Sequence, residues 1–228
     1  PHGTGGDFAR SIGVSGTDIK GLFVEGTTKP IDVGIATMVG ADGAEVKRYF
    51  LNISSFGSSG VISDNVNRMN RAGKLLGGKA AYAFGTVKGL VSYRNQRVRL
   101  RVDDIYEKEL LVNTVAVANG RYFGGSMKIA PGAYVNDGLF DVVVIGDISL
   151  VDFIRSNGKL YRGEHLDSPG FSMIRGKKVV ASVVGAKGDA LIETEGETPG
   201  RLPVTYEILP NALKVFAPWG RAEAAYEG

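Results

Sequence analysis

The sequence has 228 residues, with 27 Lys and Arg against 24 Asp and Glu, and its formal net charge of +3 is too small to indicate a nucleic-acid partner. It has no cysteine, which excludes disulfides and zinc–thiolate sites, and only two histidines, which argues against a Ser-His-Asp triad or a multi-histidine metal site. No apolar run approaches the roughly 18 residues of a membrane-spanning helix, and we expect a cytoplasmic protein.

A short helix is expected after the glycine-rich opening Gly3-Thr4-Gly5-Gly6. Asp7 is expected to cap this helix, and Phe8 and Ile12 fall four residues apart on one face. Free backbone N–H groups at such a turn suit a phosphate, although a capped turn without a ligand is the commoner explanation. A second helix is expected at residues 17–25, with an apolar stripe on one face.

The next part of the chain alternates strand patterns with helix patterns. Strands are expected at residues 30–39 and 45–54, a Gly/Ser loop at 56–60, and helices at 61–72 and 80–92. Aromatic residues in the last of these helices can line an acyl-chain groove, but ordinary core packing explains them better.

From residue 96 the chain is rich in strand patterns, and one helix with an apolar stripe is expected at residues 150–160. Strands are expected at residues 96–103, 109–118, 139–146, 177–184, 189–195, 203–208 and 213–217. Antiparallel strands with few helices indicate an α+β fold that is mainly antiparallel β and resembles a β-sandwich or a barrel.

Basic residues gather in the first of these strands, where Arg97, Arg99 and Arg101 alternate with apolar residues. The solvent face of an antiparallel strand explains this alternation best. A face that meets anionic lipid headgroups is the alternative.

A glycine-rich stretch, residues 119–145, links two apolar runs and is longer than a simple connection needs. Its glycines require sharp turns, and a long connection with polar residues at fixed places is a candidate site. The polar residues are Asn119, Arg121, Tyr122, Lys128, Asn136, Asp137 and Asp141.

Three carboxylates alternate near the end of the chain, at Glu193, Glu195 and Glu197. In a continuous strand they share one face, and repulsion between them raises the pKa of one toward the range of a general base. Gly196 also allows a turn that would direct Glu195 and Glu197 differently. A solvated acidic strand end explains the spacing equally well.

The glycine-rich stretch, NGRYFGGSMKIAPGA followed by NDGLFDVVVI, resembles the second-domain signature of the diacylglycerol kinase / sphingosine kinase lipid-kinase family. The opening GTGGDFARSIGV resembles the family's Gly-Thr-Gly-Asn-Asp-Phe-Ala-Arg loop, with Gly6 in place of asparagine. The late ETEGETPGRLPVTYEILPNALKVFAP resembles its Asp-Gly-Glu motif and C-terminal tail, with Glu195 in place of aspartate. Together these pieces cover nearly the whole chain, and the resemblance implies a β-sandwich-like lipid-kinase C-terminal domain.

The resemblance implies transfer of the ATP γ-phosphoryl group to the hydroxyl of a sphingoid base or diacylglycerol, with Mg2+ as cofactor. Two late segments are slightly more similar to sphingoid-base kinases of plant type. The implied partners are a lipid substrate and a membrane surface met peripherally, without nucleic acid, and a homodimer is compatible with the sequence.

The resemblance also implies roles for particular residues. Glu195 is the implied general base, with Glu197 as the next candidate. The implied nucleotide-facing residues are Gly3, Thr4, Gly5 and Asp7. The implied Mg2+ ligands are the Asp137 carboxylate and the carbonyls of Tyr134 and Leu139, with Asn136 where the family commonly has a second acid.

The family's Gly-Gly-Asp-Gly-Thr nucleotide motif does not occur in the sequence. We therefore expect residues 1–26 to hold the end of a nucleotide-cleft loop and connecting helices, 27–220 a β-rich substrate domain, and 221–228 a frayed tail. On its own this chain is expected to be inactive. The alternative is a catalytically silent lipid-binding or regulatory module on the same fold, since Gly6 and Glu195 both depart from active-site motifs.

Overall fold

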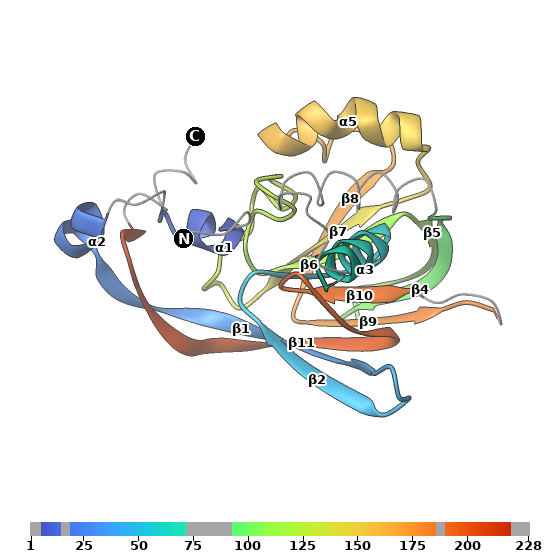
Figure 1. Ribbon diagram of the computed structural model, residues 1–228, viewed down its shortest axis with the longest axis horizontal. Helices are drawn as coiled ribbons and strands as arrows, with labels where there is room; N and C mark the ends of the chain where they lie inside the picture. The colour runs from blue at the N-terminus through green and yellow to red at the C-terminus, as the bar shows by residue number, and fades with distance from the viewer. Residues whose placement is uncertain (1–5, 15–18, 72–92, 186–189, 220–228) are drawn as a thin grey trace.

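The computed structural model describes residues 6–14, 19–71, 93–185 and 190–219 (Figure 1). The helix expected at residues 80–92, with its aromatic residues, lies outside this part. The helices are α1 (Asp7–Ser11), α2 (Ile19–Glu25), α3 (Ser58–Arg71) and α5 (Leu150–Arg162). The strands are β1 (Thr27–Val39), β2 (Glu45–Phe50), β3 (Ile53–Gly57), β4 (Gln96–Val102), β5 (Tyr106–Val112), β6 (Thr114–Ala118), β7 (Phe140–Ile145), β8 (Phe171–Gly176), β9 (Lys178–Val183), β10 (Leu191–Thr194) and β11 (Glu197–Ala217).

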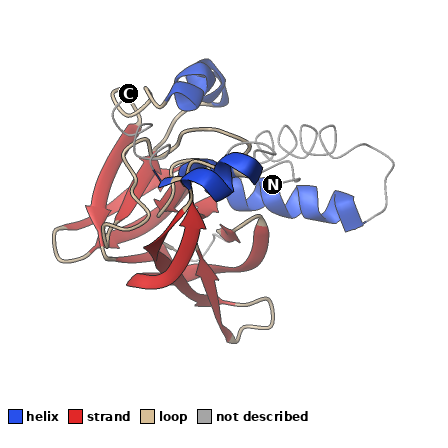
Figure 2. Ribbon diagram, turned by 90° about the vertical axis from the view of Figure 1, so that its left-hand side faces the viewer, coloured by secondary structure: helices blue, strands red, loops and turns tan. Residues whose placement is uncertain are grey.

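All strand pairs are antiparallel and belong to one sheet, in the order β5-β4-β9-β11-β10-β3-β6-β7-β8. The long strand β11 also pairs with β1, and β1 pairs with β2. The sheet nearly closes, since a Cβ atom on Gly176 at the end of β8 would lie 2.3 Å from Val102 Cγ1 in β4. Figure 2 shows the strands gathered into one curved body with helices on its outside, which confirms the expected mainly antiparallel, sandwich-like fold.

The largest hydrophobic core lies inside the curved sheet and includes the fully buried rings of Phe56, Phe140 and Tyr206. The strands β6 and β7 are buried along their whole length. A second cluster explains this, because Leu160 of α5 and Ile129 of the glycine-rich stretch pack against side chains of β6 and β7. Burial on both faces is the reason that these two strands read as continuous apolar runs.

Two expected strands are interrupted where asparagine takes backbone partners outside the ladder. The strand expected at 45–54 is β2 and β3, separated by Leu51–Asn52. The strand expected at 109–118 is β5 and β6, separated by Asn113, whose N–H faces the carbonyls of Ile145 and Gly146 at 2.9 and 3.2 Å.

Three further expectations were wrong. The loop expected at 56–60 is the end of β3 and the start of α3, since Gly57, at φ 107°, turns the chain directly from strand to helix. The strands expected at 203–208 and 213–217 are one strand, β11, which keeps its pairing with β1 across an irregularity near Asn211. Strand β8 was not expected, because its half-exposed sequence FSMIRG has weak apolar alternation.

The arginines of β4 lie on the exposed face of the sheet, as the solvent-face interpretation requires. Glu109 and Glu107 of β5 stand opposite Arg99 and Arg101, and Arg99 Nη2 lies 2.7 Å from Glu109 Oε1. These acids reduce the positive charge of the strand, which weakens the case for an anionic lipid face. Among the described helices, none has the length and apolar character needed to cross a membrane.

Candidate functional site

The break between β2 and β3 is the place where distant parts of the chain meet. The fully buried Asn119 uses its Nδ2 to donate hydrogen bonds to the carbonyl of Leu51 at 2.7 Å and to that of Asp32 in β1 at 3.1 Å. The Asn119 N–H donates to the carbonyl of Asn52 at 2.8 Å, and Asn52 Nδ2 donates to the Tyr122 carbonyl at 2.8 Å. The start of the glycine-rich stretch is therefore fixed against Leu51–Asn52.

The backbone N–H groups of the same break hold Glu195. Its Oε1 accepts hydrogen bonds from the N–H of Leu51 at 2.9 Å and from that of Asn52 at 2.7 Å. Removal of this carboxylate from water raises the pKa of Glu195, and the two amide donors oppose that rise. The residue as a whole is exposed, although its carboxylate is partly withdrawn from water.

The three glutamates do not share one strand face, because a turn at Glu195–Gly196, which the glycine allows, interrupts the row. Strand β10 ends at Thr194, and Glu195 and Gly196 both have positive φ, 52° and 87°, in the two-residue connection to β11. Glu193 instead contacts Ser55 of β3, with 2.8 Å between Oε2 and the serine Oγ. Glu197 is exposed at the start of β11.

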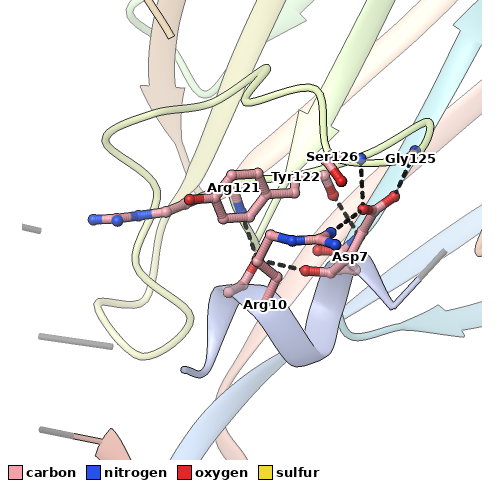
Figure 3. A network of polar contacts seen from close by, with 8 residues as sticks. Asp7, Arg10, Arg121, Tyr122, Gly125 and Ser126 are labelled. Carbon is pink, nitrogen blue, oxygen red and sulfur yellow. Dashed lines mark hydrogen bonds and ion pairs between the residues drawn. The ribbon is translucent and has the colours of Figure 1, made fainter. Parts of the chain in front are cut away.

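The sequence suggested that Asp7 caps α1, and this was wrong. Gly6 is the N-cap, and Asp7 is the first helical residue. Its carboxylate instead accepts hydrogen bonds from the N–H groups of Gly125 at 3.0 Å and Ser126 at 2.8 Å, and Arg10 Nη1 lies 2.8 Å from it (Figure 3). Consecutive positive φ angles at residues 124–126 turn these N–H groups to one side, an arrangement that binds anions. Asp7 thus fastens α1 to the glycine-rich stretch.

Two more contacts strengthen this connection. Ser11 Oγ accepts a hydrogen bond from the Arg121 N–H at 3.0 Å, and the Arg10 guanidinium lies 5.8 Å from the centre of the Tyr122 ring (Figure 3). Helix α1 therefore lies beside the glycine-rich stretch, which also contacts the Leu51–Asn52 break that holds Glu195. The residues Gly3, Thr4 and Gly5, which the resemblance assigns to the nucleotide, lie outside the described part.

The candidate Mg2+ residues lie at the far end of the same stretch. Asp137 Oδ1 accepts a hydrogen bond from the Leu139 N–H at 3.0 Å, and its Oδ2 is paired with the Arg175 guanidinium, which also donates to Asp141 Oδ1 at 2.7 Å. Burial raises the pKa of Asp141, and the neighbouring Arg175 opposes this.

The second oxygen of Asp141 tests whether this place suits a cation. Asp141 Oδ2 is buried and has no hydrogen-bond partner among the residues that the structure describes. A Cβ atom on Gly132 would lie 3.7 Å from it, so the oxygen faces the loop that carries Tyr134 and Asp137. An unsatisfied buried carboxylate oxygen suits Mg2+, which prefers oxygen ligands and keeps several waters. Asp137 has both of its oxygens engaged, by the Leu139 N–H and by Arg175, so an ion bound there would replace the arginine at Asp137. Within the described ranges no three His, Cys, Asp or Glu side chains group together, so carbonyls and water would supply the other ligands.

Two charged residues that the sequence did not single out take part in this architecture. Arg175 pairs with both acids described above. Asp32 is fully buried, and its carboxylate accepts hydrogen bonds from the N–H groups of Gly138 and Asn211, each at 2.7 Å. The sequence did contain a signal for Asp32, because it is the one acid within the apolar strand pattern at residues 30–39.

Comparisons with known proteins agree with this geometry. Residues 53–217 match the family model described as "YegS C-terminal NAD kinase beta sandwich-like domain". The chain is similar to a diacylglycerol kinase of Bacillus subtilis, at 28% identity over 227 residues, or 98% of this chain and 69% of that protein. A diacylglycerol kinase of Mycobacterium tuberculosis is 26% identical over 221 residues, or 96% of this chain and 68% of that protein.

Among solved structures, the chain is similar to the "Crystal structure of a putative diacylglycerol kinase from Bacillus anthracis str. Sterne". The TM-score is 0.64 at 25% identity, and the match covers 94% of this chain and 67% of that one. The chain thus spans about two thirds of the length of the relatives that it matches.

The role of Asp7 gives a first testable prediction. Asp7→Asn should lower the free energy of unfolding by about 1.5–3 kcal/mol, because it removes the charge from hydrogen bonds to two backbone N–H groups and an arginine. Urea denaturation measures the loss. Asp42→Asn is the matched control, since Asp42 makes an exposed local contact to the Ala44 N–H. Equal stability of the two variants would contradict the fastening role.

Proposed function

Because the chain belongs to the diacylglycerol kinase-like lipid-kinase family with a YegS C-terminal NAD kinase beta sandwich-like domain, we propose that it is the substrate-facing part of an ATP-dependent lipid kinase. In this proposal the γ-phosphoryl group of ATP passes to the hydroxyl of a lipid. Such transfer depends mainly on positioning and on stabilisation of charge, with little covalent chemistry for the protein.

The observation that carries the proposal is the position of Glu195. Two backbone N–H groups hold Oε1, and the residue is exposed at the end of a turn, so a hydroxyl group can approach the carboxylate. Glu195 then accepts the proton of the lipid hydroxyl as that oxygen attacks phosphorus. A pKa raised by removal from water favours this proton transfer.

The contacts of Asp7 support a nucleotide position near the glycine-rich stretch. Asp7 holds α1, which follows the glycine-rich opening in the sequence, against residues 124–126. Backbone N–H groups of Gly3, Thr4 and Gly5 are the proposed phosphate contacts.

Mg2+ is the proposed cofactor at the Asp137 site. The Asp137 carboxylate and the carbonyls of Tyr134 and Leu139 would hold it, and the unpartnered Asp141 Oδ2 favours positive charge there. When bound, Mg2+ would supply positive charge that reduces repulsion between the acids. Asp137 and Arg175 keep the glycine-rich stretch joined to β8.

Diacylglycerol is the proposed acceptor, since the similar proteins of B. subtilis and M. tuberculosis carry that name. A sphingoid base is the second candidate, supported by the resemblance of the late segments. Either lipid would be met at a membrane surface, where the protein would bind peripherally.

A silent lipid-binding module on this fold is the alternative function. Its support is the residue type at two positions, Gly6 and Glu195, because glutamate is one methylene longer than the family's aspartate. The ordered contacts of Glu195 with two N–H groups favour the kinase over this alternative.

The proposed activity can be tested with labelled ATP, Mg2+, and vesicles that contain diacylglycerol or a sphingoid base. A complete kinase, which joins this chain to the nucleotide-binding part of its family, should label diacylglycerol, and this chain alone should not. Absence of label on both lipids would favour the silent module. Preferential label on the sphingoid base would replace the proposed acceptor.

Substitution of Glu195 tests the general base. Glu195→Gln keeps the shape and removes the proton acceptor, so kcat of the complete kinase should fall about 10²–10⁴-fold while KM for the lipid changes little. Glu195→Asp restores the family's usual residue and should retain activity. The same assay on Glu197→Gln serves as comparison. A loss below about threefold in Glu195→Gln, too small for a base, would move the role to Glu197.

A Mg2+ titration tests the cation site without any activity assay. At a Mg2+ concentration about 100 times the dissociation constant, the chain should gain about 2.7 kcal/mol, because the ion binds only the folded state. Asp137→Ala should remove the shift in melting temperature, and Asp104→Ala, at an exposed position, should keep it. The same Mg2+ response in wild type and Asp137→Ala would contradict the assignment.

A further inference from the structure

Glu193 lies two residues before the proposed base, and both of its carboxylate oxygens are bound. Oε1 accepts a hydrogen bond from the Gly196 N–H at 2.6 Å. Oε2 lies 2.8 Å from Ser55 Oγ, which in turn lies 2.8 Å from Ser59 Oγ at the start of α3. Glu193 therefore joins the Glu195 turn to the first turn of α3 through two hydroxyl groups.

The turn that carries Glu195 needs such support. Two successive residues with positive φ suit Asn-Gly or Gly-Gly, and a glutamate at the first of them is unfavourable. Gly196 is held on one side by Glu193 and on the other by Asn67 Nδ2, which donates to the Gly196 carbonyl at 3.0 Å. The contacts of Gly196, the next residue, therefore hold the backbone of Glu195 in place.

We propose that Glu193 is a positioning residue for Glu195: in its ionised form it holds the Glu195–Gly196 turn, and protonation loosens that turn. This inference rests on the proposed function only where it concerns catalysis. The turn geometry itself depends on contacts within the chain.

The surroundings of Glu193 allow its carboxylate to gain or lose a proton near neutral pH. Burial raises the pKa of Glu193 to about 7, and the Gly196 N–H and the Ser55 hydroxyl oppose that rise. The charges that face it are the carboxylate of Glu195 on the turn and that of Asp7 on α1, and both raise it further. The titratable phenol of Tyr206 faces it from β11, while β3 and α3 contribute uncharged hydroxyls and an amide.

The two serines can serve both protonation states. When Glu193 is ionised, Ser55 donates its one proton to Oε2, and its Oγ stays 2.8 Å from Ser59 Oγ. When Glu193 is protonated, its own O–H donates to Ser55, and Ser55 then donates to Ser59. The neutral acid makes a weaker acceptor for the Gly196 N–H, because a charged acceptor forms the stronger hydrogen bond. Protonation therefore weakens the contact that supports the turn.

An NMR titration of this chain tests the inference without reference to kinase activity. With 13C-labelled glutamate, the Glu193 carboxyl signal should change with a midpoint near pH 7. The amide signals of Leu51 and Asn52, which bind Glu195, should move with the same midpoint. That midpoint should vanish in Glu193→Gln, whose neutral amide resembles the protonated acid and cannot titrate. It should persist in Glu207→Gln, which changes an exposed ion pair on β11.

Two results would overturn the inference: a Glu193 midpoint near the ordinary value of 4.5, or Leu51 and Asn52 signals that do not follow the titration of Glu193. If Glu193→Gln does not fold, Ser55→Ala replaces it. Loss of the serine donor should move the Glu193 midpoint to higher pH, because the ionised form loses a hydrogen bond. An unchanged midpoint in Ser55→Ala would also overturn the inference.

Stability gives an independent check. The folded-state pKa of Glu193, about 7, lies above the ordinary value of 4.5, so its contribution to stability is fully present below about pH 4.5 and is lost as pH rises to about 7. Wild type should therefore lose stability relative to Glu193→Gln across this window. Parallel stability curves for the two proteins would contradict the raised pKa and with it the inference.

Kinetics of the complete kinase separate a positioning role from a merely structural one. In wild type the pH profile of kcat should contain an inflection near pH 7 from Glu193. In Glu193→Gln this inflection should disappear with little change in KM, and only the inflection from the base Glu195 should remain. A pH profile of kcat that is the same in Glu193→Gln and wild type would overturn the catalytic part of the inference. If no variant phosphorylates lipid, the proposed function fails, and the NMR titration still decides the inference about the turn.

Discussion

The break between β2 and β3, at Leu51–Asn52, is the constraint on which the rest of the site depends. Its carbonyls accept hydrogen bonds from Asn119, and its N–H groups donate to Glu195, which lies more than 140 residues further along the chain. A continuous strand would have used these groups in its ladder. Because the ladder stops here, the glycine-rich stretch and the turn after β10 are brought to the same place.

The other loops of the site are fixed in a common way: a carboxylate binds the backbone N–H groups of a loop. Asp7 holds residues 125–126, Asp32 holds residues 138 and 211, and Glu193 holds residue 196. Hydrogen bonds to an ionised acceptor are stronger than neutral ones, and each satisfies backbone groups that a turn leaves without partners. The acidic residues therefore shape the loops as well as supplying candidate chemistry.

The two departures from the family motifs acquire different meanings in the structure. Gly6 is the N-cap of α1 and adopts φ 66°, a left-handed conformation that glycine reaches without strain. Glu195 also has a left-handed backbone, at φ 52°, and its side chain reaches both N–H groups at the strand break. The conformation at position 6 therefore suits glycine, whereas Glu195 keeps an unfavourable backbone conformation because its side chain is held at the strand break.

The sequence by itself determined the fold class and the main candidate region. Continuous valine-rich runs marked β6 and β7, which are buried on both faces, and the glycine-rich stretch between them contains Asn119, Asp137 and Asp141. Local patterns suffice for such features because strand burial and turn chemistry are read within a few residues. The long motif matches then identified the family over nearly the whole chain.

Only the tertiary structure decided which partners each carboxylate binds. Spacing placed Glu193, Glu195 and Glu197 on one face, but the turn at Glu195–Gly196 directs them to three different surroundings. Asp7 was expected to cap its own helix and instead binds residues 125–126, and Arg175, in a strand that the pattern did not reveal, pairs with Asp137. Each of these partners is more than 35 residues away along the chain, and contacts at that separation depend on strand register, which no local pattern encodes.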